Sequence, residues 1–229
     1  DADIQIFIES MCREMGLSNS HIFFEKCFIV VEGQSEVNYL PIAYKKIYES
    51  SMAEDGISLI NLEGNGSAIN FLKLLMRNKR DLTLLFLDKD SIHVNKEKLK
   101  INSNIIFDGL IEEEYNKFID NFIDSQTVFI GDKEFEDTFS NDIFVEILTK
   151  YRPKKNSYPW SSTEIEALRD TGKFSDRIVK IVWENCNPLS IKKPELGIML
   201  ATETKTEDIP SSIIELFTKA RAIAKIVEI

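Results

Sequence analysis

The stretch FIVVEGQSEVNYLP, residues 28–41, decides how the chain is expected to fold. Its first four residues are apolar, as in a strand that is buried on both faces, and a glutamate and a glycine follow them directly. Residues 35–50 then have the apolar spacing of a helix. Carboxylates at the end of a buried strand gain little from packing. We therefore expect Glu32 and Glu36 either to cap a helix or to hold a ligand.

The same strand-then-helix pattern recurs along the first half of the chain. Three further apolar runs predict strands, and helical patterns over 67–79 and near 110–124 separate them. The runs are ISLINLE (57–63), LTLLFLD (82–88) and TVFIG (127–131). Strands that are buried on both faces and alternate with helices predict a Rossmann-like α/β fold, in which helices flank a parallel sheet.

The second half of the chain has a different pattern. Four segments have the amphipathic spacing of helices, with a proline-containing polar loop over 152–162. The helical segments are FVEILTKY (144–151), STEIEALRD (162–170), FSDRIVKIVWE (174–184) and SSIIELFTKARAIAKI (211–226). We therefore expect a lead-in helix over 1–25, an α/β domain over 26–150 and an additional helical region over 151–229.

Composition excludes several classes of site. The chain has 229 residues, three cysteines without a CxxC pair and two histidines, so a metal site would have to use oxygen ligands. A net charge of −10 argues against a general nucleic-acid coat but not against an enzyme that acts on nucleic acid. We expect a cytoplasmic protein without membrane spans. Because the chain does not begin with Met, we also expect it to be part of a longer polypeptide.

Carboxylates follow the strands at the edge where a parallel sheet binds ligands. Asp88 and Asp90 lie at i and i+2 of an extended segment, so both can face one spot, and Glu32 ends another strand. Two carboxylates about 6 Å apart repel by about 3 kcal/mol at an effective dielectric near 20. Convergence of three acids therefore predicts a bound cation, and Mg²⁺ or Mn²⁺ are the natural oxygen-liganded choices.

Further acids have two open interpretations each. Glu36 can turn back toward Glu32 if Gly33 makes the turn, or it can simply complement a helix dipole. Glu134 and Glu136 share a face if the chain there is extended, whereas on a helix they would diverge. In that same segment, Asp137 could act as an N-cap.

Taken together, these motifs resemble a known family. The EGxxE after an apolar strand and the later DxD resemble the Toprim fold of topoisomerases, primases and some nucleases. More narrowly, four segments look like the C-terminal Toprim domain of OLD-family (overcoming lysogenization defect) endonucleases. They are FFEKCFIVVEGQSEVNYLP (23–41), LFLDKDS (85–91), KEFEDTF (133–139) and TGKFSDRIV (171–179).

The resemblance implies an endonuclease that hydrolyses DNA phosphodiester bonds with two Mg²⁺ or Mn²⁺ ions. It implies two groups of metal ligands and a catalytic lysine, Lys173, for which Lys180 is a possible substitute. The first ligand group would be Glu32, Glu36, Asp88 and Asp90, and the second would be Glu134 and Glu136. The resemblance also gives Glu32 a catalytic role. The family further implies an N-terminal ABC-type ATPase on the same polypeptide, a homodimer, and a role in anti-phage defence or DNA processing.

Two other readings account for part of the pattern. FLDKDS also resembles the DxDx[ST] motif of HAD-type phosphatases, in which the first Asp is a nucleophile and one Mg²⁺ suffices. That reading leaves the glutamates unexplained. The other alternative is a catalytically inactive Toprim domain that serves as an assembly module.

Overall fold

The computed structural model describes residues 25–62, 79–89, 117, 120–121, 124–169, 172–187 and 190–226. Several predicted features fall wholly or almost wholly outside these residues, and they stay predictions. They are the lead-in helix over 1–25, the helix over 67–79, most of the helix near 110–124, and Asp90.

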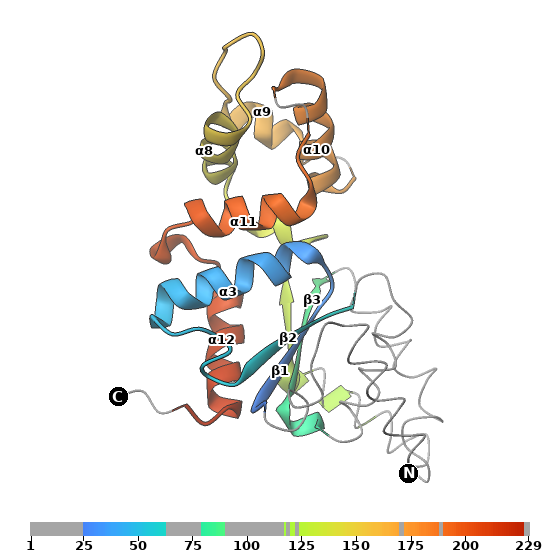
Figure 1. Ribbon diagram of the computed structural model, residues 1–229. Helices are drawn as coiled ribbons and strands as arrows, with labels where there is room; N and C mark the ends of the chain where they lie inside the picture. The colour runs from blue at the N-terminus through green and yellow to red at the C-terminus, as the bar shows by residue number, and fades with distance from the viewer. Residues whose placement is uncertain are drawn as a thin grey trace, which may run out of the picture.

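The described part of the chain contains a four-stranded parallel sheet, in the order β2-β1-β3-β4 (Figure 1). The strands are β1 (Cys27–Val31), β2 (Ile57–Asn61), β3 (Thr83–Asp88) and β4 (Thr127–Ile130). Each lies within one of the four predicted apolar runs, so the parallel α/β fold is confirmed. In the register, Val31 lies opposite Asn61 and Phe86, while Asp88 lies opposite Ile130. The carboxyl ends of β1 and β3 therefore lie side by side.

β1 occupies an inner position because every one of its side chains is apolar and buried. Alternate side chains point to opposite faces of a strand, and those of Cys27, Ile29 and Val31 join the main hydrophobic core. Helix α3 (Gln34–Tyr48) follows β1 after only two residues, which matches the predicted helix. The short connection brings the N-terminus of α3 to the carboxyl ends of the strands.

Two helices from the C-terminal part of the chain pack against α3 or the sheet. The last described helix, α12 (Ser211–Ile223), packs on β1, β3 and β4, and its Phe217 ring lies 5.1 Å from that of Tyr44 on α3. Helix α11 (Lys193–Glu203) runs alongside α3 (Figure 1), with contacts from Ser35 to Lys193 at one end and from Lys46 to Thr202 at the other. The sequence analysis missed α11, although Pro194 near its start and a hydrogen bond from the Lys192 amide to the Glu195 side chain are ordinary start signals.

The remaining helices form a lobe beyond α11 (Figure 1). They are α8 (Asn141–Tyr151), α9 (Ser162–Ala167) and α10 (Phe174–Asn185), and together with α12 they confirm the four predicted helices. The rings of Phe144 and Phe174 meet edge to face at 4.7 Å inside the lobe. One cluster of buried side chains extends from the sheet into the lobe, while the predicted boundary at residue 150 stays a prediction.

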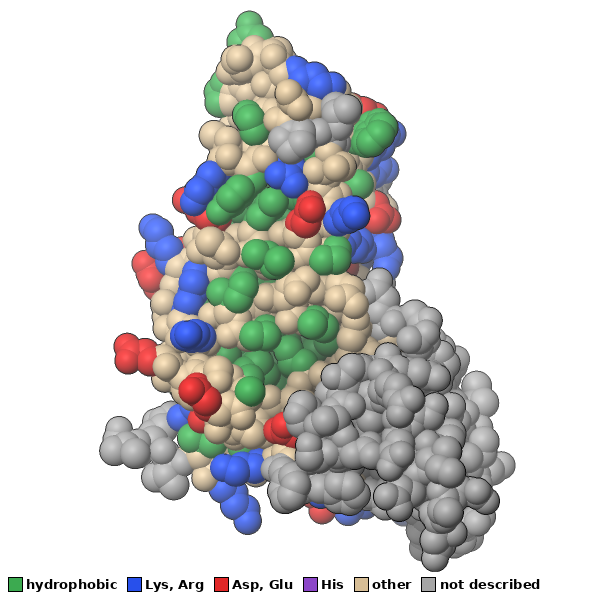
Figure 2. Space-filling view, viewed as in Figure 1, with side chains coloured by type: hydrophobic (Ala, Val, Ile, Leu, Met, Phe, Trp, Pro, Cys, Tyr) green, Lys and Arg blue, Asp and Glu red, His purple; other side chains and the backbone are tan. Residues whose placement is uncertain are grey.

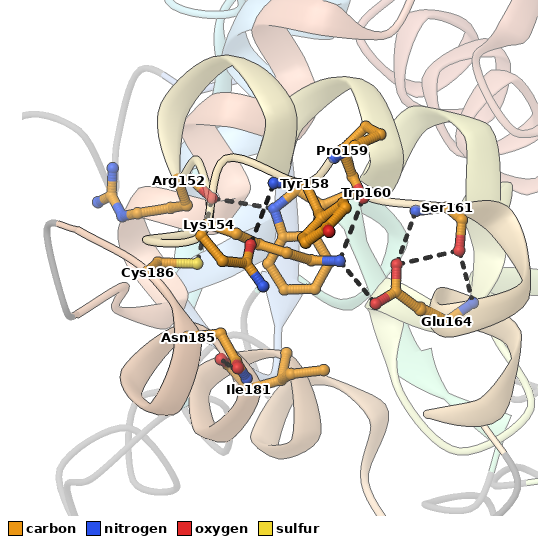
Figure 3. A network of polar contacts seen from close by, with 11 residues as sticks. Arg152, Lys154, Tyr158, Pro159, Trp160, Ser161, Glu164, Ile181, Asn185 and Cys186 are labelled. Carbon is orange, nitrogen blue, oxygen red and sulfur yellow. Dashed lines mark hydrogen bonds and ion pairs between the residues drawn. The ribbon is translucent and has the colours of Figure 1, made fainter.

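The loop between α8 and α9 is held against the end of α10 by a polar network (Figure 3). The Trp160 indole and the Cys186 thiol both donate to the Arg152 carbonyl, at 2.9 and 3.1 Å. Lys154 lies over the Trp160 ring and forms an ion pair with Glu164 at 2.6 Å. These contacts fix the loop in one position. None of the described helices has the length and apolarity that crossing a bilayer requires.

Candidate active site

An open pocket of about 260 Å³ lies at the carboxyl ends of β1 and β3, where the N-terminal ends of α3 and α11 also meet. Carboxylates and lysines make up most of its lining. The lining residues are Glu32, Gly33, Gln34, Ser35, Glu36, Asp88, Glu134, Phe135, Glu136, Lys173, Lys193 and Pro194. Of the seven site residues predicted from the sequence, the structure thus brings six to one pocket. The seventh, Asp90, lies outside the described residues.

Glu32 and Glu36 line the pocket from the end of β1 and from the first turn of α3. A carboxylate oxygen of Glu32 accepts a hydrogen bond from the Asp88 amide at 3.3 Å, which joins the end of β1 to the end of β3. Glu36 lies in the first turn of α3 and is buried. Its Oε2 would lie 3.1 Å from a Cβ placed on Gly33, so the carboxylate turns back over this residue. Gly33 itself is extended, with φ −142°, so a glycine is not needed here for its φ. It is needed because it leaves room for the Glu36 carboxylate.

The backbone that brings Glu134 and Glu136 to the pocket differs from both conformations expected from the sequence. Glu134 is extended, and the 3₁₀ helix η3 (Phe135–Thr138) begins directly after it, so Glu134 and Glu136 both line the pocket although Glu136 is helical. Gly131, with φ +63°, allows the tight approach, because a Cβ there would lie 2.0 Å from the Glu134 carbonyl oxygen. Asp137 is not the N-cap: it lies within η3 and accepts a hydrogen bond from the Glu134 amide at 3.1 Å.

Both carboxylates of this group hold the N-terminus of a helix. Glu134 accepts hydrogen bonds from the Ser175 amide and, at 2.7 Å, from the Ser175 hydroxyl, in the first turn of α10. Glu136 accepts from the Ser35 hydroxyl at 2.6 Å, in the first turn of α3. The sequence analysis missed Ser35 and Ser175, because an isolated serine has no distinguishing pattern. The acids therefore stabilise the arrangement of the two helices as well as lining the pocket.

The pocket shifts the protonation of two groups. Burial raises the pKa of Glu136, and the nearby charge of Glu134 raises it further, while the hydrogen bond from Ser35 opposes the shift. Partial burial would lower the pKa of Lys193, but the carboxylates of Glu136 and Glu134 outweigh it, and the net direction is upward. Lys193 therefore stays charged, with its Nζ 3.6 Å from Glu134.

The structure distinguishes the candidate lysines. Lys173 precedes α10 as its N-cap, is exposed and lines the pocket. Lys180 is exposed two turns further along α10 and is not among the lining residues. Lys193, at the start of α11, is a lining residue that the sequence analysis missed, since the stretch IKKPE shows only a basic pair before an undetected helix.

The lining residues offer oxygen donors, which suit Mg²⁺ and Mn²⁺. Within the described ranges, no three His, Cys, Asp or Glu side chains are arranged as a group that could hold a metal ion. The donor chemistry around the pocket thus fits a hard cation, while a complete ligand set is not assembled there. Asp90, which the sequence places two residues after Asp88, lies beyond those ranges.

A parallel sheet with a Glu-Gly after β1 and an aspartate ending β3 defines a Toprim-type α/β domain. Residues 23–90 match the family model for the Toprim domain of overcoming lysogenization defect protein-like proteins. The chain therefore carries an OLD-like Toprim domain, as its motifs led us to expect. No curated protein matches the chain significantly.

Solved structures extend the likeness in fold to nearly the whole chain. The C-terminal region of the Xanthomonas campestris pv. campestris OLD protein, phased with iodine, has a TM-score of 0.58 at 16% identity over 89% of this chain and 98% of that one. The platinum-phased structure has a TM-score of 0.52, also at 16% identity, over 90% and 97%. For the C-terminal region of the Burkholderia pseudomallei OLD protein the TM-score is 0.58 at 16% identity, over 88% and 100%. The described helices after the sheet thus belong to the same fold.

Proposed function

We propose that this chain is a metal-dependent endonuclease that hydrolyses DNA phosphodiester bonds. The observation that carries the proposal is the convergence of five carboxylates and two lysines on one open pocket of an OLD-like Toprim domain. This family assignment accounts for the DxD motif, and it also accounts for the glutamates that a phosphatase would leave unexplained.

In this proposal, the first ligand group holds a divalent cation. Glu32 and Asp88 supply hard oxygen donors from adjacent strand ends, and Glu36 supplies one from the first turn of α3. Asp90 would complete the group. Divalent cations bound there would stabilise charge on the phosphate and lower the pKa of an attacking water. Without them, a DNA phosphate would meet several carboxylates, each repelling it by about 3 kcal/mol at about 6 Å and an effective dielectric near 20. Substrate binding at the pocket should therefore require metal.

The second ligand group has two tasks under this proposal. A carboxylate has two oxygens with about four acceptor positions, so each can keep its serine hydrogen bond and still face a cation. Glu136 uses Oε1 for Ser35, which leaves Oε2 for a metal. Glu134 uses both oxygens for Ser175, so it would contribute a remaining lone pair.

The lysines supply positive charge to the substrate. The exposed Lys173 lies at the pocket mouth and would contact the phosphate as negative charge builds up in the transition state. Lys193, held near Glu134, is the second candidate for this role. We assign to the full-length protein an N-terminal ABC-type ATPase, a homodimer, a cytoplasmic location and a role in anti-phage defence or DNA processing.

The proposal is tested by incubating the purified chain with supercoiled plasmid in EDTA, Mg²⁺ or Mn²⁺. Glu32→Gln and Asp88→Asn remove charge from the pocket, while Glu146→Gln makes the same change on the exposed side of α8. We expect nicking or linearisation that needs metal, persists in Glu146→Gln and is lost in the two pocket variants. Absence of cleavage, with no metal binding by calorimetry, would instead identify an inactive assembly module.

A further inference from the structure

Helix α10 has a basic face that begins at the pocket. Lys173, Arg177 and Lys180 follow one another at spacings of four and three residues, which places them on the same side of a helix. The opposite stripe, Phe174 and Ile178 followed by Val182, is fully buried in the lobe. This packing fixes the rotation of α10, and the basic face must point away from the core.

The basic side chains on this face contrast with the chain as a whole, which has a net charge of −10. Asp176 lies at the edge of the face, with the Lys193 Nζ 4.0 Å from its carboxylate. The exposed Glu184 follows one turn after Lys180 on the same side of the helix. In Figure 2, Lys and Arg side chains recur, interspersed with Asp and Glu, along the edge of the molecule where α10 lies in Figure 1. Between the pocket and Lys180, the face therefore carries three basic side chains beside a pocket that is rich in acids.

An aromatic side chain and a further lysine end this face. Trp183, in the last turns of α10, has 62% of its surface exposed, although tryptophan usually buries most of its ring. Lys155 is held at the C-terminal end of α10: its amide donates to the Asn185 carbonyl at 2.8 Å and its Nζ to that of Glu184 at 3.4 Å. The end of α10 thus combines a fixed cation with an exposed indole.

We propose that this face of α10 binds a single nucleic-acid strand where it leaves the pocket, with phosphates on the basic side chains and an unpaired base stacked on Trp183. The inference rests on the proposed function and adds to it a substrate class, DNA that is single-stranded or locally unpaired beside the cut. Lys173 and Lys180 are about 10 Å apart along the helix axis, so different phosphates of the same strand can reach both side chains. Cationic tracks with stacking aromatics are the usual means of binding single strands.

The test measures binding in EDTA, so that it does not depend on cleavage or on metal. A short fluorescein-labelled single strand and the duplex of the same sequence are titrated with the chain and followed by fluorescence anisotropy, from about 50 to 200 mM salt. Lys180→Glu and Trp183→Ala alter the proposed face without touching the pocket. Lys205→Glu and Ile198→Ala are matched controls, an exposed lysine after α11 and an exposed apolar residue on α11.

We expect Lys180→Glu to weaken binding of both probes about tenfold near 0.1 M salt and to reduce the salt slope by about one, as for the loss of one phosphate contact. Trp183→Ala should weaken single-strand binding by about fivefold or more and leave duplex binding nearly unchanged. Controls should match the wild-type chain. Affinities of the two variants equal to those of their controls would overturn the inference, even if the plasmid is cleaved. Expected binding losses without plasmid cleavage would support the α10 face while refuting the nuclease.

Discussion

Replacing Gly197 by alanine should destabilise the protein, although the same change stabilises most helices. A Cβ at this position of α11 would lie 2.5 Å from the Ser35 carbonyl oxygen and 2.9 Å from its Cα. The helices would have to separate by several tenths of an ångström to restore van der Waals contact. Overpacking of this kind costs about 1–3 kcal/mol, whereas alanine gains about 1 kcal/mol over glycine in a helix interior. We expect a net loss of up to about 2 kcal/mol in the free energy of unfolding.

The displacement should also reach the pocket. Ser35 donates to Glu136 and, at 3.2 Å, to the Lys193 carbonyl, so moving the start of α3 pulls on one acid and one lysine of the site. Cleavage of plasmid should therefore fall further than stability. Thr202→Ala, at an exposed position of α11, is the control, and we expect it to gain a few tenths of a kcal/mol from helix propensity.

Urea denaturation and a plasmid nicking time course measure the two effects. If Gly197→Ala raised the unfolding free energy by the full helix-propensity gain and left nicking unchanged, the close approach of α11 to α3 would be refuted.

Four further substitutions separate the roles of residues that line the pocket or contact its carboxylates. Lys173→Ala should abolish plasmid cleavage without changing the denaturation midpoint, whereas Lys193→Ala should lower both, because it removes the cation beside the buried carboxylates. Ser175→Ala removes one of two hydrogen bonds to Glu134 and should cost about 1.5–3 kcal/mol in urea denaturation. Glu136→Gln should stabilise the protein at neutral pH, because the buried carboxylate has a raised pKa. Its folded form binds more protons than its unfolded form between pH 4.5 and that raised pKa, so wild-type stability falls as the pH rises through this interval.

Each of these outcomes has a clear opposite. Full cleavage by Lys173→Ala and none by a folded Lys193→Ala would transfer the transition-state role to Lys193. A Ser175→Ala protein as stable as the wild type would show that the Glu134 carboxylate does not hold α10. For Glu136→Gln, the stability gain should disappear as the pH falls to 4.5 and below, and a gain that is independent of pH would exclude burial of the charge as its cause.

The sheet could be predicted from the sequence because each strand is a mainly apolar run, most clearly CFIVV, between segments of helical spacing. The first acidic group followed from the same pattern, since a residue that ends a parallel strand must lie at the ligand-binding edge. For Glu32 and Asp88 the local sequence thus determines the location in the fold.

The rest of the site depends on contacts between distant segments. Lys193 reaches the pocket because α11 packs alongside α3 with their N-terminal ends together, and Ser35 lies 158 residues away from it along the chain. Such contacts leave no periodic signal in one sequence. Glu134 and Glu136 converge because a 3₁₀ turn begins between them, which neither the extended nor the α-helical expectation covers.

The place of α12 has a consequence for synthesis of the protein. The four described strands end at Ile130, yet residues 211–223 cover β1, β3 and β4. At about 5–20 residues per second, translation needs roughly 4–16 s to make the intervening chain. Throughout that time the apolar side chains beneath α12 lack their final cover on the ribosome. We therefore expect nascent chains that end before residue 211 to be held by chaperones and to be cleaved readily by protease.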